Sequence, residues 1–431
     1  MNIPLDRLYH YINDIAEDIY GDRVIIYRFW PHGSKNISDL NTLQKLKSHW
    51  LEMSSSPLVW CNDQEPLDYE YYSQHIRKKN VEWVELLRSL NLFAEPTNLD
   101  HNRNIFEKSL LLHSEKRSSN LEQYHRCGRL IGVYYWSHAI ISRDWFRYAE
   151  HVEQQKQVDQ TFLIYNRAWS NTREYRLYFA ELLIDLNLQK HCKTSVNPIE
   201  PELGIHYDSH QFKNPIWRPQ TVLENYFPIS NAHSHYSADF DIEDYESTDI
   251  EVVLETLFDD SRLHLTEKSL RPIACGQPFM LTGTVGSLEY LRSYGFKTFG
   301  SVWDEYYDRI ENPQERLVYI ATTMRHISNW TPEERASKMA EAQSIADYNK
   351  KHFFSQEFFN LIVNELKTNL QSAFAELNSC NNYKSWYAQH TKITSFPEVE
   401  EFLNRNQDTN MPTKFNHDFL LQLVKSKIDS Q

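Results

Sequence analysis

Apolar residues recur along the first half of the chain in short blocks, and each block predicts a buried strand. The blocks lie at Arg23–Trp30, Pro57–Cys61, Ser109–Ser114 and Ile131–Trp136. Before them, Leu5–Tyr20 has apolar residues three and four positions apart, which predicts a helix. Strands separated by helical or irregular connections are typical of a parallel, doubly wound sheet. The first half is therefore predicted to be an α/β domain.

The same pattern starts again after a polar stretch at Val152–Asp159. Strands are predicted at Thr161–Tyr165, Ile250–Glu255 and within Gly276–Leu281, and helices at Thr172–Leu188, Thr266–Cys275 and along Pro332–Ser379. The helix at Thr172–Leu188 is expected to be amphipathic. We therefore expect an α/β fold with two Rossmann-like domains, at residues 1–155 and 156–330. A C-terminal helical extension at residues 331–431 should pack back on them, and a ligand cleft should lie between the domains.

The composition is that of a globular protein. Of the 431 residues, 41% are hydrophobic and 24% are charged. No run of about 18 apolar residues predicts a membrane span, and the chain does not open with the basic and apolar regions of a signal peptide. The five cysteines are scattered without a CxxC pair, which favours a reducing compartment and disfavours structural zinc. These features predict a cytoplasmic protein with no membrane partner.

The net charge of −14 argues against tight binding to nucleic acid. Most of this acidity lies after residue 150, however, and the first half is close to neutral. A face that contacts phosphates has candidate cations there, namely Arg77, Lys78, Lys79, Arg126, Arg129, Arg143 and Arg147.

Several common nucleotide and hydrolase motifs are absent from the sequence. It has no G-x-x-x-x-G-K-[ST] phosphate loop, no G-x-G-x-x-G fingerprint and no G-x-S-x-G turn. Asp239-Phe240-Asp241 has the spacing of a D-x-D metal motif, but it lies in an acidic, irregular stretch that is more typical of solvated surface. The sequence therefore requires no metal ion and no cofactor.

The segment Ile250–Phe299 holds the most informative polar residues. Glu267 and Lys268 begin a predicted helix, and Arg271 follows one turn later on the same face as Glu267. A carboxylate can accept hydrogen bonds from ribose hydroxyls, while cations and helix N-terminal amides can hold a pyrophosphate. The alternative is an ordinary surface pair between Glu267 and Arg271.

This segment resembles the donor-site segment of GT-B glycosyltransferases. It is most similar to glycosyltransferase-like proteins of phages and marine bacteria, and more distantly to fucosyltransferase-like and exostosin-like enzymes. Those proteins carry T-E-K-x-x-[KR]-P-I, then P-F, then G-F-x-T-F, which stand here as Thr266–Ile273, Pro278-Phe279 and Gly295–Phe299. The close match covers this stretch alone. The resemblance implies a GT-B fold, a nucleotide-sugar donor and transfer of a hexose or pentose.

The resemblance also implies two further donor-binding residues. In GT-B enzymes a basic residue after the first strand of the second domain often reaches the donor pyrophosphate, and Arg167 stands at that place. Glu255, just before the motif, would add a second polar contact. An arginine in an ordinary loop between a strand and a helix is the alternative for Arg167.

Glycosyl transfer with inversion needs a general base, and three residues are candidates. Asp63 and then Glu65 follow the second predicted strand, where they would face the cleft, although Asp63 is equally suited to cap a helix. His138 lies where the fourth strand joins a helix, and a purely structural histidine is its alternative.

The sequence leaves open which acceptor the enzyme would use, and also whether the protein is an enzyme or only binds nucleotides. A hydroxymethylated base of phage DNA is one acceptor, in which case the enzyme would work in the host cytoplasm, and a glycan or lipid-linked sugar is the other. A non-catalytic nucleotide-binding protein of the same fold is the rival of a different class. The stereochemical outcome and the oligomeric state are likewise open.

Overall fold

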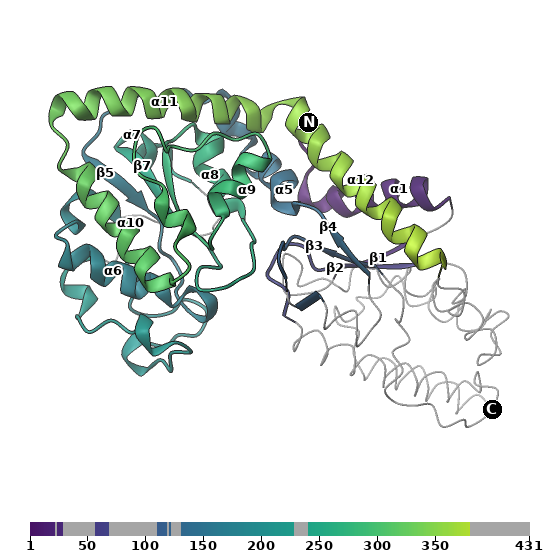
Figure 1. Ribbon diagram of the computed structural model, residues 1–431, viewed down its shortest axis with the longest axis horizontal. Coiled ribbons are helices and arrows are strands. Elements are labelled where there is room, and N and C mark those ends of the chain that lie inside the picture. Colours follow the sequence, from purple (N-terminus) through teal and green to yellow (C-terminus); the bar gives the residue numbers. More distant parts are fainter. Residues whose placement is uncertain are drawn as a thin grey trace, which may run out of the picture. The chain divides into compact units, whose positions relative to one another are not determined.

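The computed structural model describes residues 1–21, 24–28, 57–68, 110–118, 120–121, 131–227 and 240–379. The chain divides into two compact units (Figure 1). Unit 1 contains Met1–Leu5 and Trp136–Val363, and unit 2 contains Asp6–Tyr135 and the chain from Asn364 onward. The chain therefore passes between the units three times. The domain boundaries expected near residues 155 and 330 stay predictions.

Unit 2 contains a parallel sheet whose strands fall within the four predicted apolar blocks. The strands are β1 (Ile25–Arg28), β2 (Leu58–Cys61), β3 (Leu110–His113) and β4 (Ile131–Tyr134), in the order β1-β2-β3-β4. The described strands thus follow chain order without a reversal. A Rossmann-like sheet reverses its strand order at one point, so this character of the first half stays a prediction.

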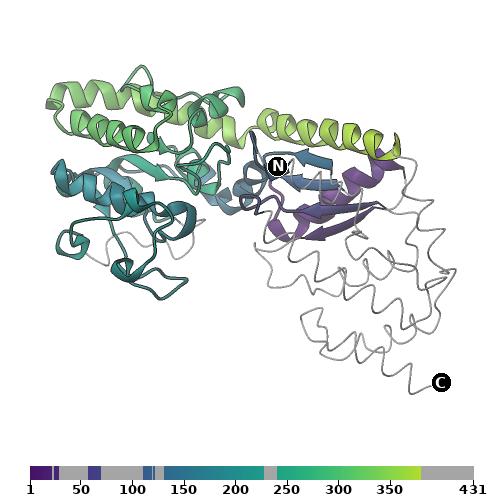
Figure 2. The same cartoon turned by 60° about the horizontal axis from the view of Figure 1, so that its bottom comes forward.

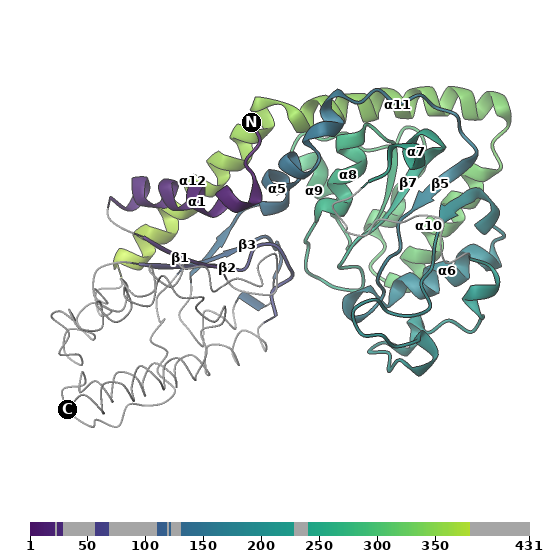
Figure 3. The same ribbon diagram turned by 180° about the vertical axis from the view of Figure 1, so that it is seen from behind.

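Two helices from opposite ends of the chain pack together in unit 2. They are α1 (Leu5–Tyr20) and the second part of α12 (Gln356–Ser379), which lie side by side in Figure 3. The rings of Tyr20 and Phe374 are 5.0 Å apart, and Asn369 Nδ2 donates a hydrogen bond of 2.8 Å to the carbonyl of Tyr134. Helix α12 thereby contacts the end of β4.

Unit 1 contains a second parallel sheet, and its strand order does reverse. Its strands are β5 (Gln160–Ile164), β6 (Cys192–Thr194), β7 (Thr248–Leu254) and β8 (Phe279–Thr282), in the order β6-β5-β7-β8. The chain leaves β5 toward one edge of the sheet and leaves β7 toward the other. Such a reversal opens a crevice at the carboxyl ends of the two central strands, where open α/β sheets bind ligands.

Helices cover both faces of this second sheet (Figure 2). They are α5 (Ser137–Trp145), α6 (Tyr175–Asp185), α7 (Ile242–Glu246), α8 (Glu267–Cys275), α9 (Ser287–Ser293), α10 (Pro313–Ser328) and α11 (Pro332–Phe354). Short 3-10 helices join them: η1 (Arg147–His151), η2 (Asn171–Arg173), η3 (Gln189–His191), η4 (Tyr207–Ser209), η5 (Pro215–Trp217), η6 (Leu223–Asn225) and η7 (Tyr306–Arg309). Helix α6 packs against α10, whereas α8 packs against α5 and α11. Every residue of β7 is buried, as expected for a strand covered on both faces.

The sequence prediction for α6 was partly wrong. The helix is shorter than Thr172–Leu188, and it is buried on nearly all sides rather than on one. Its charged residues Arg176 and Glu181 are also buried, because each satisfies backbone groups of neighbouring loops. A charged residue on an apolar helix is therefore a poor marker of the exposed face when loops cover that face.

Within unit 1, buried carboxylates hold a long segment in place, residues 195–227, whose regular structure is limited to the short helices η4, η5 and η6 and one isolated bridge. Glu174 accepts hydrogen bonds from the backbone amides of Lys213 and Asn214, and Glu181 accepts them from Gln220 and Thr221. Loops of this length with little regular structure are uncommon in compact domains and are often functional. Here the segment follows β6 and so leaves the sheet at its carboxyl edge.

Two other sequence expectations can be compared with the described residues. Within those ranges, no helix combines the length and apolar character needed to cross a membrane. Cys61, Cys192 and Cys275 are buried, and burial raises the pKa of Cys192 and Cys275.

Lys156 lies at the amino edge of the second sheet, where it binds backbone carbonyls near the start of β7. Its Nζ donates hydrogen bonds of 2.8 Å to the carbonyls of Tyr245 and Thr248, and it also bonds the side chain of Gln277. Burial lowers the pKa of Lys156 to about 8, although nearby Asp249 opposes the shift. The group is therefore charged at neutral pH and loses its proton more readily in the folded protein than in the unfolded chain.

Replacing Lys156 with Met should change how stability depends on pH. Between about pH 8 and the ordinary lysine value of 10.5, the unfolded chain holds this proton and the folded protein does not. The free energy of unfolding therefore gains a contribution from Lys156 as pH rises through this window. Urea unfolding of both proteins at several pH values should show wild type gaining stability relative to Lys156→Met. Parallel pH curves would contradict this assignment.

Candidate functional site

The carboxyl edge of the second sheet brings Arg167 and Glu255 to the strand-order reversal. Leu163 of β5 pairs with Glu251 of β7. Arg167 follows β5, which ends at Ile164, and Glu255 follows β7, which ends at Leu254. Arg167 is exposed, whereas Glu255 is fully buried. Both predicted donor-binding residues therefore follow the carboxyl ends of the two central strands, where the strand order reverses.

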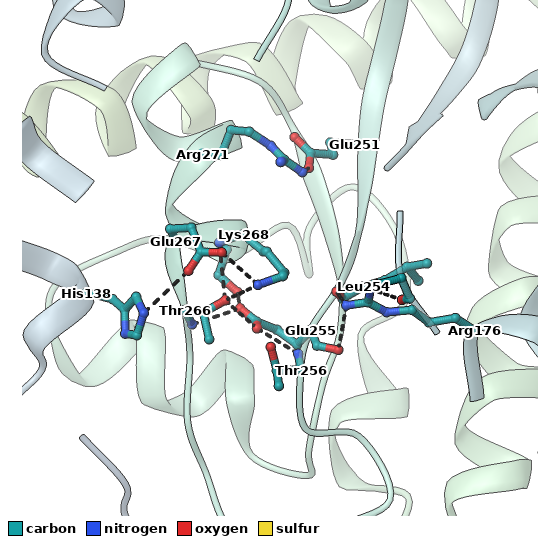
Figure 4. Close-up of polar contacts among 12 residues, drawn as sticks. His138, Arg176, Glu251, Leu254, Glu255, Thr256, Thr266, Glu267, Lys268 and Arg271 are labelled. Atoms are coloured by element: carbon teal, nitrogen blue, oxygen red, sulfur yellow. Dashed lines mark hydrogen bonds and ion pairs between the residues drawn. The ribbon is translucent and has the colours of Figure 1, made fainter. Parts of the chain in front are cut away.

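Glu255 fixes the start of helix α8 to the end of β7 (Figure 4). Its Oε1 accepts hydrogen bonds from the Thr266 amide at 3.0 Å and from Ser269 Oγ at 2.5 Å. Its Oε2 accepts them from Thr266 Oγ1 at 2.8 Å and from the Thr256 amide at 3.1 Å. Four donors thus surround a carboxylate with no solvent exposure. Glu255 positions the site from beneath rather than lining it.

Local sequence explains why α8 begins and ends where it does. Thr266 is the N-cap, and its hydroxyl accepts a hydrogen bond of 3.3 Å from the Lys268 amide. The helix ends at Gly276, whose φ of 71° is the left-handed conformation that glycine adopts at little cost. The helix N-terminus therefore points its amides toward the carboxyl edge of the sheet, where an anion is favoured.

Glu267, Lys268 and His138 form a polar group at this helix start. Lys268 Nζ lies 2.7 Å from Glu267 Oε1, and His138 Nε2 lies 3.4 Å from Glu267 Oε2. The lysine side chain is the most accessible of the three, at 17% exposed against 7% for Glu267 and 3% for His138. His138 comes from the first turn of α5, and its ring meets that of His264 edge to face at 5.3 Å. A cation, a carboxylate and an imidazole are thus gathered within one unit.

Arg271 lies apart from this group, inside the unit. Its Nη2 is 2.6 Å from Glu251 Oε1, and its guanidinium lies 4.2 Å from the centre of the Tyr165 ring. Burial disfavours the charged guanidinium, but Glu251 outweighs this and raises the pKa of Arg271. The structure therefore brings Glu267 and Lys268 together but directs Arg271 to Glu251. Its donor-binding role stays a prediction.

Tyr175 and Arg176 shape the site but were not predicted. Arg176 donates hydrogen bonds to the carbonyls of Ala168 and Leu254, both at 2.6 Å, and Tyr175 Oη donates one of 2.7 Å to the carbonyl of Glu255. These bonds hold the segments after β5 and β7 at fixed positions. The sequence feature that could have indicated them is a charged residue, Arg176, within a mostly apolar helix.

Asp63, the first candidate for the general base, lies in a buried network of unit 2. Its Oδ1 accepts a hydrogen bond of 2.9 Å from Tyr9 Oη, and its Oδ2 accepts one from Tyr135 Oη. Burial and the neighbouring carboxylate raise the pKa of both tyrosines, so each remains a donor. Asp63 is 2% exposed, while Glu65 in the same loop is half-buried. Of the three candidates, only His138 belongs to the unit that holds the predicted donor residues.

The cations proposed for a phosphate-contacting face are only partly described. Arg143 is buried and donates hydrogen bonds to the carbonyls of Met1, Phe353, Phe354 and Ser355, so it is not available to a phosphate. Arg147 is exposed and pairs with Asp144. The remaining five, Arg77, Lys78, Lys79, Arg126 and Arg129, lie outside the described residues.

The possible metal motif is also only partly described. Asp239 lies outside the described residues, and Asp241 accepts a hydrogen bond of 3.0 Å from the Glu243 amide as the N-cap of α7. In the part of the chain with assigned positions, no three His, Cys, Asp or Glu side chains are grouped as metal ligands. Asp241 thus has a structural role at a helix start.

Comparison of the chain with protein-family models gave no match, and comparisons with curated proteins and with solved structures gave none either. The geometry of the site is therefore the basis for its interpretation.

Replacing Glu255 with Gln should destabilise unit 1. The amide nitrogen of glutamine cannot accept hydrogen bonds, so two buried donors would lose their acceptor. We expect a loss of roughly 2–4 kcal/mol in the free energy of unfolding. Urea denaturation can measure it, with Glu333→Gln as the control, because Glu333 is an exposed carboxylate in the first turn of α11. Equal stability of the two variants would show that Glu255 does not hold the helix.

Proposed function

We propose that this protein is a glycosyltransferase, which moves a sugar from a nucleotide-sugar donor to an acceptor hydroxyl. The observation that carries the proposal is the start of α8, where Thr266, Glu267 and Lys268 stand at the carboxyl end of β7 beside the strand-order reversal. The resemblance of this same segment to GT-B donor sites adds to it. The protein would act in the cytoplasm.

The donor pyrophosphate would bind at the N-terminus of α8. Helix amides and the Lys268 ammonium offer it donors and positive charge, and Arg167 is exposed beyond the neighbouring strand. The Glu267 carboxylate, now 2.7 Å from Lys268, would accept hydrogen bonds from the ribose hydroxyls once the phosphates compete for the lysine. Glu255 binds Thr266 and Ser269, and so holds the helix start that carries Glu267 and Lys268.

His138 is the general base that this geometry favours. The Glu267 carboxylate lies 3.4 Å from Nε2, where it would orient the ring and balance the charge that forms when the ring takes up a proton from the acceptor hydroxyl. Asp63 and Glu65 remain the candidates from unit 2. Both oxygens of Asp63 already accept a hydrogen bond from a tyrosine hydroxyl in a buried network.

The acceptor of the proposed reaction is a hydroxymethylated base in DNA or a hydroxyl of a glycan or lipid-linked sugar. The burial of Arg143 removes one cation from the face suggested for DNA, which favours a glycan. A non-catalytic nucleotide-binding protein would bind the donor without turnover. Offering several nucleotide sugars with each acceptor class, and identifying products by mass spectrometry, separates these cases.

Replacing Lys268 with Met should weaken nucleotide binding. Loss of a charge-assisted hydrogen bond to phosphate lowers affinity by about 10- to 100-fold. Calorimetry with a panel of nucleoside diphosphates measures the effect, and Lys190→Met serves as control because Lys190 is an exposed lysine of the same unit. If both variants bind the best nucleotide as wild type does, the phosphates do not lie at the start of α8.

Replacing His138 with Gln should depress turnover by about 10²–10⁴-fold while nucleotide affinity is kept, because a general base acts on the acceptor. His326→Gln is the control, since His326 is exposed on α10. The same assay on Asp63→Asn and Glu65→Gln tests the other two candidates. Undiminished turnover in His138→Gln, with loss in one of those variants, would move the base to unit 2.

A further inference from the structure

Unit 1 has a concave surface whose walls do not include Thr266–Lys268. A groove of about 1020 Å³ is lined by the segment after α9, by η7 and by α11. Gln343 of α11 donates a hydrogen bond of 2.9 Å to the carbonyl of Gly276, which ends α8. A nine-residue helix is about 13 Å long, so the α11 wall and the proposed donor site lie at opposite ends of α8.

Part of the sequence block that resembles GT-B proteins lines this groove. Phe296, Lys297 and Thr298 of the G-F-K-T-F block are among its walls, while Glu267 and Lys268 are not. The donor site therefore leaves this block without a role.

The groove presents an exposed aromatic ring that its neighbours hold in place. Tyr306 is 55% exposed, and its ring centre lies 5.9 Å from that of Tyr319. Asp304 accepts a hydrogen bond of 2.8 Å from the Tyr306 amide and another from the Tyr319 hydroxyl. One carboxylate thus holds the backbone of Tyr306 and the side chain of Tyr319, whose ring lies beside the exposed Tyr306 ring.

Fixed polar groups lie along the same groove. Thr298 Oγ1 accepts a hydrogen bond of 2.8 Å from Arg292 Nη1 and donates one of 2.7 Å to Glu305 Oε2. Gly300 allows the chain to pass this carboxylate, because a Cβ there would stand 3.1 Å from Glu305 Oε2. The Arg292 guanidinium and the Glu305 carboxylate are therefore paired at the groove wall, 3.5 Å apart.

The charges in the groove identify the class of ligand. Three cationic residues line it, together with four carboxylates, Asp304, Glu305, Asp308 and Glu341. A polyanion such as DNA would meet the carboxylates, and a polycation would meet the cations. A neutral ligand with many hydroxyls suits both kinds of group, since hydroxyls donate to carboxylates and accept from guanidinium. An exposed tyrosine face adds apolar contact for the C–H surface of a sugar ring.

We propose that this groove binds a neutral oligosaccharide chain, at a place separate from the donor site. Its volume lies at the upper end of the roughly 300–1,000 Å³ typical of small-ligand pockets, which suits several sugar rings. The groove does not depend on the proposed transfer reaction, and its ligand can be tested by binding alone.

Binding of neutral oligosaccharides by the full chain tests this directly. Maltoheptaose, cellohexaose and chitohexaose would be titrated by calorimetry, alongside a single-stranded DNA 12-mer as the anionic probe. At least one sugar should bind with a dissociation constant in the millimolar range or lower. Tyr306→Ala should raise this dissociation constant about tenfold. Tyr306→Trp should retain binding because it keeps the aromatic face. Tyr226→Ala, which removes a comparably exposed tyrosine outside the groove, should leave it unchanged.

Three outcomes would overturn the proposal. They are no binding of any of the three sugars up to about 10 mM, sugar binding that Tyr306→Ala leaves intact, and binding of the DNA alone. Because Tyr306 is not at the start of α8, nucleotide affinity should be equal in wild type and Tyr306→Ala. A failure of the carbohydrate groove is therefore distinguishable from a failure of the donor site.

Discussion

The buried carboxylate of Glu255 is the interaction on which the candidate site depends. Its side chain binds the start of α8, while its backbone carbonyl accepts hydrogen bonds from Tyr175 and Arg176 of α6. One residue at the end of β7 thus joins a strand to two helices that have different packing partners. Since four donors satisfy the carboxylate, its burial is balanced by hydrogen bonds rather than left as an unpaired charge.

This arrangement leaves the polar side chains above Glu255 available for function. Lys268 and Glu267 neutralise each other, and His138 meets Glu267 from a different helix. Of the two side chains, Lys268 is the more exposed to solvent. A ligand that binds it through phosphates would have to break the Lys268–Glu267 contact. Arg271, by contrast, is paired with Glu251 deep in the unit, where its separation from water makes the pair costly to open.

Much of the fold could be predicted from the sequence because its strands are short apolar blocks and α8 has a clear beginning and end. Thr266 and Gly276 marked that helix at both ends, and the expected strands fall close to the observed ones. Strand β6 was missed because its three residues are too few to form a pattern. The reversal of strand order likewise follows from which strands pair, and this is a long-range property.

The polar contacts of the site were less predictable because their partners are distant in sequence. Arg271 was placed near a ligand by its spacing from Glu267, but its partner Glu251 lies 20 residues away in a strand. Asp63 was assigned to a cleft by its place after a strand, while Tyr9 and Tyr135 approach it from 54 and 72 residues away. Local spacing selects a face of a helix or the end of a strand, and tertiary packing selects the partner.

The central claim is that the start of α8 binds the phosphates of a nucleotide sugar. A crystal structure of the protein grown with a nucleoside diphosphate tests it most directly. The account predicts phosphate oxygens within hydrogen-bond distance of the backbone amides at the α8 N-terminus and of Lys268 Nζ, with Arg167 approaching from beyond β5. A nucleotide bound elsewhere on the protein, with the Lys268–Glu267 contact intact, would contradict it.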